Sequence, residues 1–412
     1  MIAQMHDSSS KPRPQVELRH FPQFGHLRRA DFLLAEGVDH LNHGGYGATP
    51  RSVLDAARAW QQAMEADPST FFRRDLAGLL RRAADRVAAF LGGRGEDWAF
   101  VENATSGLNA VIASLALGPG DELLCLSQVY GAIGNALSYH AGRSGARLVQ
   151  VDVPVPFVDP APLLEALSAA IGPRTRLACF DHITSAGAVV LPIHEMAALC
   201  HRHGVPVAID GAHAPGQLAL DVARLGVDWY VGNLHKWAFA AKGTAVIWCA
   251  PEHQRVLHPT AISHALGHGF PVEFDYTGTR DNSAWLAVPA ALDYAEELGA
   301  EALRAHNAAL AREAGAMLTL AWGSEAAAAP EFCASMVSVR LPVSFLGGAG
   351  DDRDAARTFA ARLNEEHSIT AGIMVLDGGL WVRVSAQIYN EIGDYERLAA
   401  IGKTLGGKAL IR

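Results

Sequence analysis

The sequence predicts an α/β fold: a large domain with a mostly parallel sheet flanked by helices, and a smaller C-terminal α/β domain. Short apolar runs alternate with helical segments of about a dozen residues, the pattern of βαβ units. The chain has 412 residues, too many for one small core. Half of its residues are hydrophobic and 19% are charged, the balance of a globular protein.

The elements are expected in the following order. Two helices lie between residues 55 and 91, separated at Asp67-Pro68. A strand, a Thr-Ser-Gly turn and a helix follow over residues 98–117. Further strands are expected at 121–126, 146–153, 176–183, 205–210, 226–233 and 243–249, with helices after Tyr130 and over 192–204. Beyond Pro289 a long helical pattern leads to strands at 335–342 and 379–387, with a helix at 351–367 between them.

Three parts of the chain follow from this order. Residues 1–20 are polar and contain Pro and Ser, so we expect a mobile N-terminal arm. Residues 21–290 form the large domain, in which segment 21–50 could pack on the small domain. Residues 291–412 form the small domain together with the linking helix.

Charge and cysteine usage narrow the class of protein. The net charge is −9 and no Lys/Arg run stands out, so we expect neither a nucleic-acid nor a membrane partner. The N-terminus lacks an apolar signal core, and no stretch approaches the roughly 20 apolar residues of a membrane span. Four of the five cysteines fall in apolar runs, where buried free thiols are expected. We therefore expect a cytoplasmic protein.

Polar clusters follow four of the expected strands. They are residues 103–107, 182–185, 210–213 and 233–236. Ligands of open parallel sheets bind beyond the carboxyl ends of the strands. The sequence therefore predicts one binding site to which all four clusters contribute.

Two of these clusters carry a specific chemistry. A lysine held in such a pocket loses hydration, which lowers its pKa and leaves a neutral amine able to attack an aldehyde. Pyridoxal 5′-phosphate (PLP) needs such a lysine, an acid beside its pyridinium nitrogen and a phosphate cradle. The sequence offers one candidate for each: Lys236 as the lysine, Asp210 as the acid, and the Thr105-Ser106-Gly107 turn at a helix start as the phosphate cradle. Taken singly, Asp210 could equally cap a turn, and a Thr-Ser-Gly turn could simply begin a helix.

These residues belong to stretches that resemble the class V aminotransferase family of fold-type I PLP enzymes, from about Leu41 to Leu398. Within it the chain is most similar to the isopenicillin N epimerase-like branch. The stretches that carry the resemblance are LNHGGYGATP (41–50), ENATSGLNAV (102–111), DHITSAGAVVLPI (181–193), DGAHAPGQLALDVARLGVDWYVGNLHKW (210–237), TGTRDNSAW (277–285) and WVRVSAQIYN (381–390).

The resemblance implies a role for each matching position at the cofactor ring. Lys236 would form the internal aldimine with PLP, and Asp210 would pair with the pyridine nitrogen. His213 would lie near the phenolic oxygen of PLP, as would Ser185 or its neighbour Thr184. Lys236, Asp210 and His213 are thus the expected catalytic residues.

The resemblance also implies contacts around the ring. The expected phosphate contacts are Thr105, Ser106, His235 and Asn233. Thr279 would reach the phosphate of the neighbouring subunit, so a homodimer is expected. The ring of Tyr130 would stack on the cofactor face, and Arg383 would bind the α-carboxylate of an amino-acid substrate. Asn42 and Tyr46 are expected in the walls of the substrate pocket. Local sequence alone would also allow His213 and Tyr130 in the core and Arg383 on the surface.

The reaction stays open among several outcomes. The resemblance implies chemistry at Cα of an amino acid through an external aldimine, with Lys236 as general base. Epimerisation is the first expectation, C–S lyase activity by β-elimination the second and transamination the third; the non-enzyme alternative is a scaffold that kept the fold. Desulfurase chemistry is disfavoured because Cys333, the one C-terminal cysteine, leads into an apolar strand.

No metal site is expected. The histidines His201 and His203 lie at the end of a predicted helix, where cations complement the helix dipole. The sequence contains no H-E-x-x-H motif and no Cys/His cluster typical of zinc.

Overall fold

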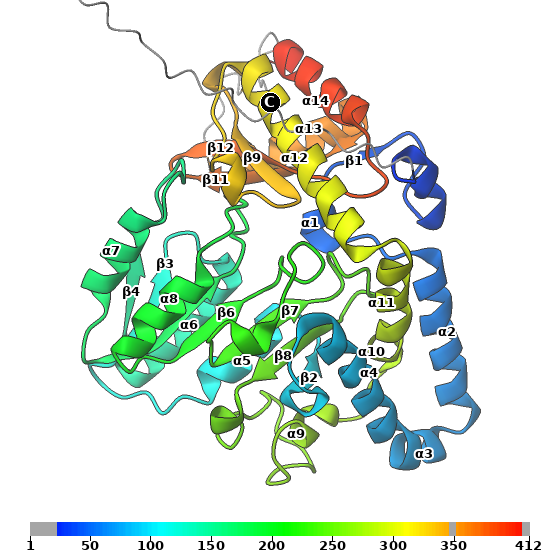
Figure 1. Cartoon of the computed structure of the whole chain (residues 1–412), viewed down its shortest axis with the longest axis vertical. Coiled ribbons are helices and arrows are strands. Elements are labelled where there is room, and N and C mark those ends of the chain that lie inside the picture. The colour runs from blue at the N-terminus through cyan, green and yellow to red at the C-terminus, as the bar shows by residue number, and fades with distance from the viewer. Residues whose placement is uncertain (1–22, 346–351, 406–412) are drawn as a thin grey trace, which may run out of the picture.

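The structure, a computed structural model, describes residues 23–345 and 352–405 (Figure 1). The predicted mobile arm at residues 1–20 lies outside the described residues. The predicted helix over 351–367 is present as α13 (Arg353–His367).

A seven-stranded sheet forms the centre of the larger part of the molecule. Its strand order is β2-β8-β7-β6-β5-β3-β4. All strands run in one direction except β8, which is antiparallel to both of its neighbours. The mostly parallel sheet flanked by helices is thus confirmed. The strands are β2 (Trp98–Val101), β3 (Glu122–Leu126), β4 (Arg147–Val151), β5 (Thr175–Asp181), β6 (Val207–Asp210), β7 (Trp229–Asn233) and β8 (Ala245–Cys249).

Helices cover both faces of this sheet, because alternate strand residues point to opposite faces. In β6, Val207 and Ile209 join the core beneath α7 and α8, whereas Ala208 joins the core beneath α5 and α6. Apolar residues on both faces explain why the strands read as continuous apolar runs. The helices of this part are α2 (Arg51–Ala66), α3 (Pro68–Thr70), α4 (Leu76–Leu91), α5 (Ala104–Ala113), α6 (Gly131–Ser144), α7 (Ala161–Ala170), α8 (Ile193–Arg202), α9 (Val272–Asp275), α10 (Ser283–Leu286) and α11 (Val288–Glu297).

A three-stranded antiparallel sheet, in the order β11-β12-β9, forms the core of the C-terminal part. It lies above the large sheet in Figure 1, among α12 (Ala300–Trp322), α13 and α14 (Ile392–Leu405). Its strands are β9 (Met336–Arg340), β11 (Gly372–Leu376) and β12 (Gly379–Ser385). The sequence reasoning assigned no strand at β11. Asp377 and Gly378, both at positive φ, form the two-residue turn to β12, and an Asp-Gly pair is a recognised hairpin signal.

The N-terminal segment reaches across to this smaller part. The short strand β1 (Asp39–His40) pairs in parallel with β10 (Ile369–Thr370). Directly after β1 the chain forms α1 (His43–Tyr46), which brings it back toward the large sheet. The boundary placed at residues 290 and 291 stays a prediction.

The five cysteines, all within the described residues, are free and buried, as expected for four of them. Burial raises the pKa of the Cys125 thiol to about 12, so it does not act as a thiolate. Across the described ranges, none of the helices combines the length and apolar character that crossing a bilayer demands. The cytoplasmic location stays a prediction.

Candidate active site

The polar strand ends meet at one cavity of about 550 Å³. It opens at the carboxyl ends of β5, β6 and β7, the edge at which open parallel sheets bind ligands. The structure brings most of the predicted site residues together here. Those that line the cavity are Tyr46, Thr105, Tyr130, Ser185, Asp210, His213, Asn233, His235 and Lys236.

The backbone of Lys236 is fixed by the N-terminal segment. The imidazole of His43 donates from Nε2 to the Lys236 carbonyl oxygen at 2.9 Å, and its Nδ1 accepts from the Tyr389 hydroxyl at 2.8 Å. Gly47 has a φ of +74°, and a Cβ at this position would collide with the backbone of His235. The close approach of these two loops therefore requires glycine.

Within the described ranges the Lys236 amine has one hydrogen-bond partner, His213. The distance from Lys236 Nζ to His213 Nε2 is 3.2 Å. Burial, followed by the positive charge of Arg383, lowers the pKa of Lys236 to about 7. Burial also lowers the pKa of His213 well below its ordinary value, so the imidazole is neutral. The arrangement therefore holds a lysine whose neutral and charged forms are both populated near pH 7.

Asp210 lies beside a second carboxyl group that sequence reasoning missed. Asp181, the last residue of β5, is paired in register with Asp210, the last residue of β6. Both are buried and line the cavity. Burial and the neighbouring Asp210 raise the pKa of Asp181 well above its usual range, and burial raises that of Asp210 less strongly. Two carboxyls this close cannot both ionise readily, so Asp181 keeps its proton.

The turn at the start of α5 is held together by two amide side chains. Asn103 Oδ1 accepts from the Ser106 amide at 2.8 Å, and Asn233 Oδ1 accepts from the Ala104 amide at 2.9 Å. Of the predicted Thr105-Ser106-Gly107 cradle, the Ser106 amide is therefore already occupied. Thr105 is the member of this turn that lines the cavity.

His235 lies in the same wall, and whether its ring nitrogen Nε2 can donate a hydrogen bond depends on its protonation. Its Nδ1 lies 2.8 Å from the Thr244 carbonyl oxygen, to which it must donate. Burial lowers the pKa of His235 to about 4, so its Nε2 carries no proton in the ligand-free protein. An anion bound beside it would raise that pKa and turn Nε2 into a donor.

Arg383 is buried next to Ser185 but, like Asn42, does not line the cavity. It reaches residues far away in the sequence. Its Nη1 donates to the Ser185 carbonyl oxygen at 2.7 Å, and Nη2 donates to Asn42 Oδ1 at 3.0 Å. The N–H on Nε has no partner among the described residues. Burial lowers the pKa of Arg383 to about 10, which leaves the guanidinium charged at neutral pH.

Two predicted phosphate contacts do not line this cavity. Ser106 lines a smaller neighbouring cavity with Arg280 and Trp285. Thr279 is exposed, and its hydroxyl lies 3.3 Å from the Tyr276 hydroxyl. The role of Thr279 in a neighbouring subunit stays a prediction.

Besides Asp181, sequence reasoning missed Glu102 and Lys242 in the cavity wall. Glu102 forms an ion pair with Arg280, and Lys242 Nζ lies 3.2 Å from Thr49 Oγ1. Glu102 directly precedes the Asn103–Gly107 cluster in the sequence, and this position could have identified it as a site residue. Lys242 follows an apolar stretch, and no local pattern separates it from a surface lysine.

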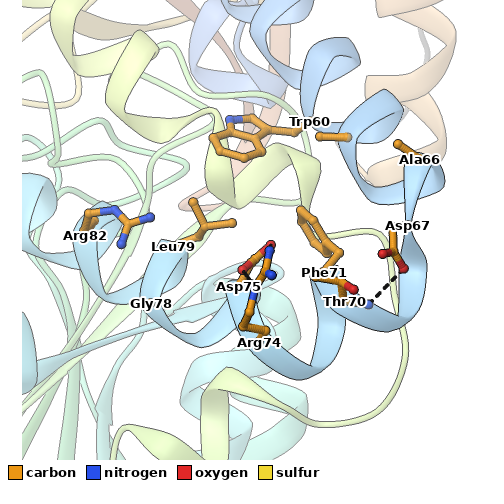
Figure 2. A pocket seen from close by; sticks show the side chains of 11 residues that line it. Trp60, Ala66, Asp67, Thr70, Phe71, Arg74, Asp75, Gly78, Leu79 and Arg82 are labelled. Atoms are coloured by element: carbon orange, nitrogen blue, oxygen red, sulfur yellow. Dashed lines mark hydrogen bonds and ion pairs between the residues drawn. The ribbon is translucent and has the colours of Figure 1, made fainter.

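A second cavity, of about 490 Å³, lies among α2, α3 and α4 (Figure 2). None of the predicted site residues lines it. Three of its charged groups are already occupied: Asp67 accepts from the Thr70 amide at 3.1 Å, and Arg74 pairs with Asp75 at 2.6 Å. It offers no chemistry comparable with that of the lysine cavity.

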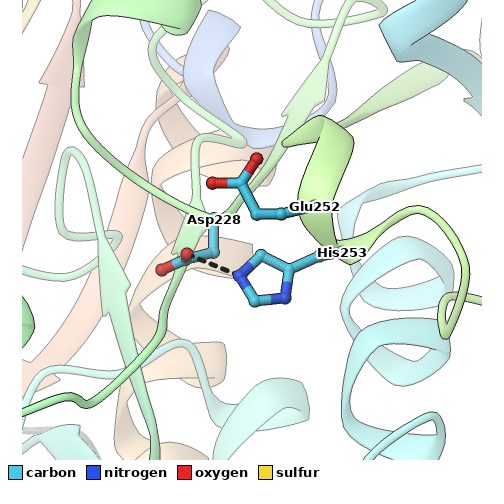
Figure 3. Close-up of side chains that lie close together, drawn as sticks. All are labelled: Asp228, Glu252 and His253. Carbon is cyan, nitrogen blue, oxygen red and sulfur yellow. Dashed lines mark hydrogen bonds and ion pairs between the residues drawn. The ribbon is translucent and has the colours of Figure 1, made fainter.

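The histidine at the end of α8 belongs to an ion-pair cluster. Asp228 accepts from His201 Nε2 at 2.8 Å. It also accepts from His253 Nε2 at 2.8 Å, and Glu252 lies beside these two residues (Figure 3). Asp228 immediately precedes β7, so the cluster lies at the opposite edge of the sheet from Lys236. Both carboxylate oxygens of Asp228 are satisfied by these histidines.

The family model described as Aminotransferase class-V matches residues 43–342, well over half of the chain. The chain belongs to the class V aminotransferase family. Putative L-cysteine desulfhydrase 1 from Oryza sativa subsp. japonica is 35% identical over 403 residues, which span 90% of this chain and 84% of that protein. Isopenicillin N epimerase from Streptomyces clavuligerus is 32% identical over 398 residues, which span 92% and 98%. The predicted family and its likeness to isopenicillin N epimerases are confirmed.

Solved structures share the class V aminotransferase fold of this chain. The apo structure of a cysteine desulfurase from Thermococcus onnurineus NA1 has a TM-score of 0.76 at 17% identity and covers 93% of this chain and 99% of that one. The complex of the cystine C–S lyase C-DES with cysteine persulfide has a TM-score of 0.75 at 22% identity and covers 91% and 98%. At these identities the likeness shows the fold alone.

Class V aminotransferases are PLP-dependent enzymes, so this chain is an enzyme with PLP as its cofactor. The cavity fits that group by its donor set. It offers an amine of lowered pKa, a buried carboxyl and the hydroxyl of Thr105. The buried Nδ1 of His213 lacks a partner among the described residues and would find one in a bound polar group.

The pKa of Lys236 predicts how this class V enzyme takes up PLP. Only the neutral amine attacks an aldehyde, and it predominates above the pKa of about 7. The rate constant for PLP uptake by the PLP-free protein should rise about tenfold per pH unit below pH 7 and level off above it. Stopped-flow absorbance measures this, with N-acetyl-lysine as the control whose rate rises to about pH 10. A rate constant that keeps rising to about pH 10, as it does for the control, would contradict the lowered pKa of Lys236.

Proposed function

We propose that this PLP-dependent enzyme is a C–S lyase that removes the sulfur substituent of L-cysteine or an S-substituted L-cysteine by β-elimination. The observation that carries the proposal is the Lys236 amine, 3.2 Å from His213 in a cavity that Asp210 also lines. Bound PLP would stabilise the negative charge that develops at Cα when its proton leaves. The four relatives named L-cysteine desulfhydrases, at 30 to 35% identity, support this choice.

The residues of the candidate site have separate tasks in this reaction. Lys236 takes the Cα proton, and the neutral imidazole of His213 accepts a hydrogen bond from the ammonium that results. That ammonium can then pass a proton to the departing sulfur. Arg383 binds the substrate α-carboxylate, and its unpartnered Nε–H supports this assignment. Asp210 holds a proton at the pyridine nitrogen.

The bond changes are balanced. The Cα–H and Cβ–S bonds break, and a double bond forms between Cα and Cβ. Water then replaces the nitrogen, so that cysteine and water give hydrogen sulfide, pyruvate and ammonia. One base on one face of Cα suffices, which is what Lys236 provides.

Epimerisation is the second candidate. It requires an acid on the face of Cα opposite Lys236, and the exposed ring of Tyr130 in the cavity wall is the group that favours it. Relatives named isopenicillin N epimerase, at 32 and 33% identity, support it as well.

Product analysis separates the two candidates. The PLP-loaded enzyme is incubated in D₂O with L-cysteine and with S-substituted cysteines. Equal amounts of pyruvate, ammonia and thiol support the lyase. Deuterium at Cα with a growing D-enantiomer and no pyruvate overturns the lyase in favour of epimerisation. A keto acid formed while the cofactor becomes its pyridoxamine form overturns both.

A homodimer is part of this proposal. Thr279 is exposed and does not line the cavity of its own chain, which is the arrangement expected if it serves a neighbouring subunit. Light scattering of the purified enzyme measures the mass, and a monomer contradicts this assembly.

A further inference from the structure

A third cavity, of about 480 Å³, adjoins the lysine cavity. Tyr130 and Ser185 line both cavities, so they form a common wall. The other walls come from the loop after β3, from α13 and from β11. Arg383 donates to Ser185, so a substrate with its α-carboxylate at Arg383 has its side chain next to this opening.

The loop after β3 places a buried polar group in this cavity. Gln128 is 6% exposed and lines the cavity. Neither its Oε1 nor its Nε2 has a hydrogen-bond partner among the described residues. An unsatisfied buried amide destabilises the folded protein. Such a group is expected to bind something that the ligand-free chain does not supply.

Helix α13 adds a cation on the opposite side. Arg353, its first residue, is exposed and forms no hydrogen bond or ion pair within the described parts of the chain. The acidic side chains next to Arg353 in the sequence already have other partners. Asp352 accepts from the amides of Asp354 and Ala355, and the Asp354 carboxylate pairs with Arg357 at 3.1 Å. A guanidinium at a helix N-terminus, where the dipole is itself positive, favours an anion beside it.

The remaining wall is apolar. Val129 and the β11 residues Ile373, Met374 and Leu376 line it. The cavity therefore combines an apolar passage with an amide and two guanidinium groups, of which that of Arg357 is already paired with Asp354. These are the features that a side chain with methylene groups and a terminal carboxylate would require.

We propose that this cavity is a distal substrate subsite that binds the terminal carboxylate of an S-(carboxyalkyl)-cysteine or a similarly long acidic amino acid, through Arg353 and Gln128. This rests on the proposed function only in that the substrate is an α-amino acid held by Arg383. The methylene groups of the substrate pack on Val129 and Met374. The subsite would thereby select the class of amino-acid side chain, which the lysine cavity does not determine.

Two substrates that differ only in charge test the subsite. S-(2-Carboxyethyl)-L-cysteine and S-(2-carbamoylethyl)-L-cysteine have nearly the same shape. The wild-type kcat/KM should favour the acid by about tenfold or more, the gain from a charge-assisted hydrogen bond. In Arg353→Gln this preference should fall to within about twofold. Arg357, on the next turn of α13, also lines this cavity, but Asp354 already offsets its charge. Arg357→Gln is therefore the matched control and should keep most of the preference.

Gln128→Leu gives a second readout. It should also reduce the preference for the acid, while the melting temperature of the substrate-free enzyme stays the same or rises, because an unsatisfied amide is removed. A fall in melting temperature would reveal a structural partner for Gln128 and overturn its assignment. Equal turnover of acid and amide by the wild type, or equal losses in Arg353→Gln and Arg357→Gln, would overturn the subsite.

Failure of the subsite and failure of the lyase proposal are distinguishable. Titration of the PLP-loaded enzyme with each compound, followed by visible absorbance, measures binding without turnover. A preference for the acid in this titration supports the subsite even when no pyruvate forms. Pyruvate formed equally from both compounds supports the lyase and overturns the subsite.

Discussion

Lys236→Ala is expected to lower kcat/KM by at least about 10³-fold, because it removes both the covalent anchor of PLP and the base for Cα. The fold should stay intact. Among the described residues the amine forms a hydrogen bond with His213 Nε2 alone, and it is poorly hydrated, so its loss removes no stabilising contact of consequence. Steady-state kinetics, circular dichroism and the melting temperature measure these effects.

Absorbance and labelling supply the control for this variant. The wild type should absorb at about 400–430 nm when loaded with PLP, and borohydride should fix the cofactor on the peptide that contains Lys236. Lys242→Ala is the matched variant: it removes a lysine from the same cavity wall and should keep both signals. Turnover within threefold of the wild type in Lys236→Ala would contradict the mechanism.

Asp210→Asn is expected to lower kcat by about 10²–10³-fold, the usual cost of removing one preorganised electrostatic partner. The amide is isosteric, and its oxygen can still accept from the Ala212 amide, which lies 2.9 Å from Asp210 Oδ1. The geometry of the turn is thus kept while the negative charge at the pyridine nitrogen is lost. A shifted visible spectrum of the PLP-loaded variant should accompany the fall in kcat.

The neighbouring carboxyl provides the control for Asp210. Asp181 is paired with it in register, and its raised pKa keeps it protonated. Asp181→Asn then changes no charge at neutral pH and should lower kcat far less than Asp210→Asn. Equal losses in the two variants would show that both carboxylates are ionised in the working enzyme, and would contradict this assignment of charge.

Much of the fold could be predicted from local sequence. The seven strands of the large sheet were all expected, because apolar runs between turn residues mark buried strands. Strand β11 was missed although Asp377-Gly378 signals a hairpin, because its residues show no alternation: only its two ends are buried, and Val375 is exposed. Helix α7 was likewise not assigned, although Pro160 marks its start.

The candidate site could be predicted only in part. Lys236, Asp210 and His213 stand at strand ends, and strand ends converge by the geometry of a parallel sheet. Asp181 was missed because its importance depends on the register of β5 against β6, which no local pattern encodes. Ser106 was assigned to a phosphate, whereas in the structure its amide bonds to Asn103 and it lines a different cavity.

The sequence by itself determined the succession of the large-sheet strands along the chain and the types of side chain at their ends. Each of these depends on residues within a few positions of one another. The tertiary structure alone decided which distant groups come together: Arg383 meets Asn42 across 341 positions, and His43 holds the Lys236 carbonyl across 193. It also decided the charges, since the lowered pKa of Lys236 and the raised pKa of Asp181 come from burial and from neighbours that only folding brings together.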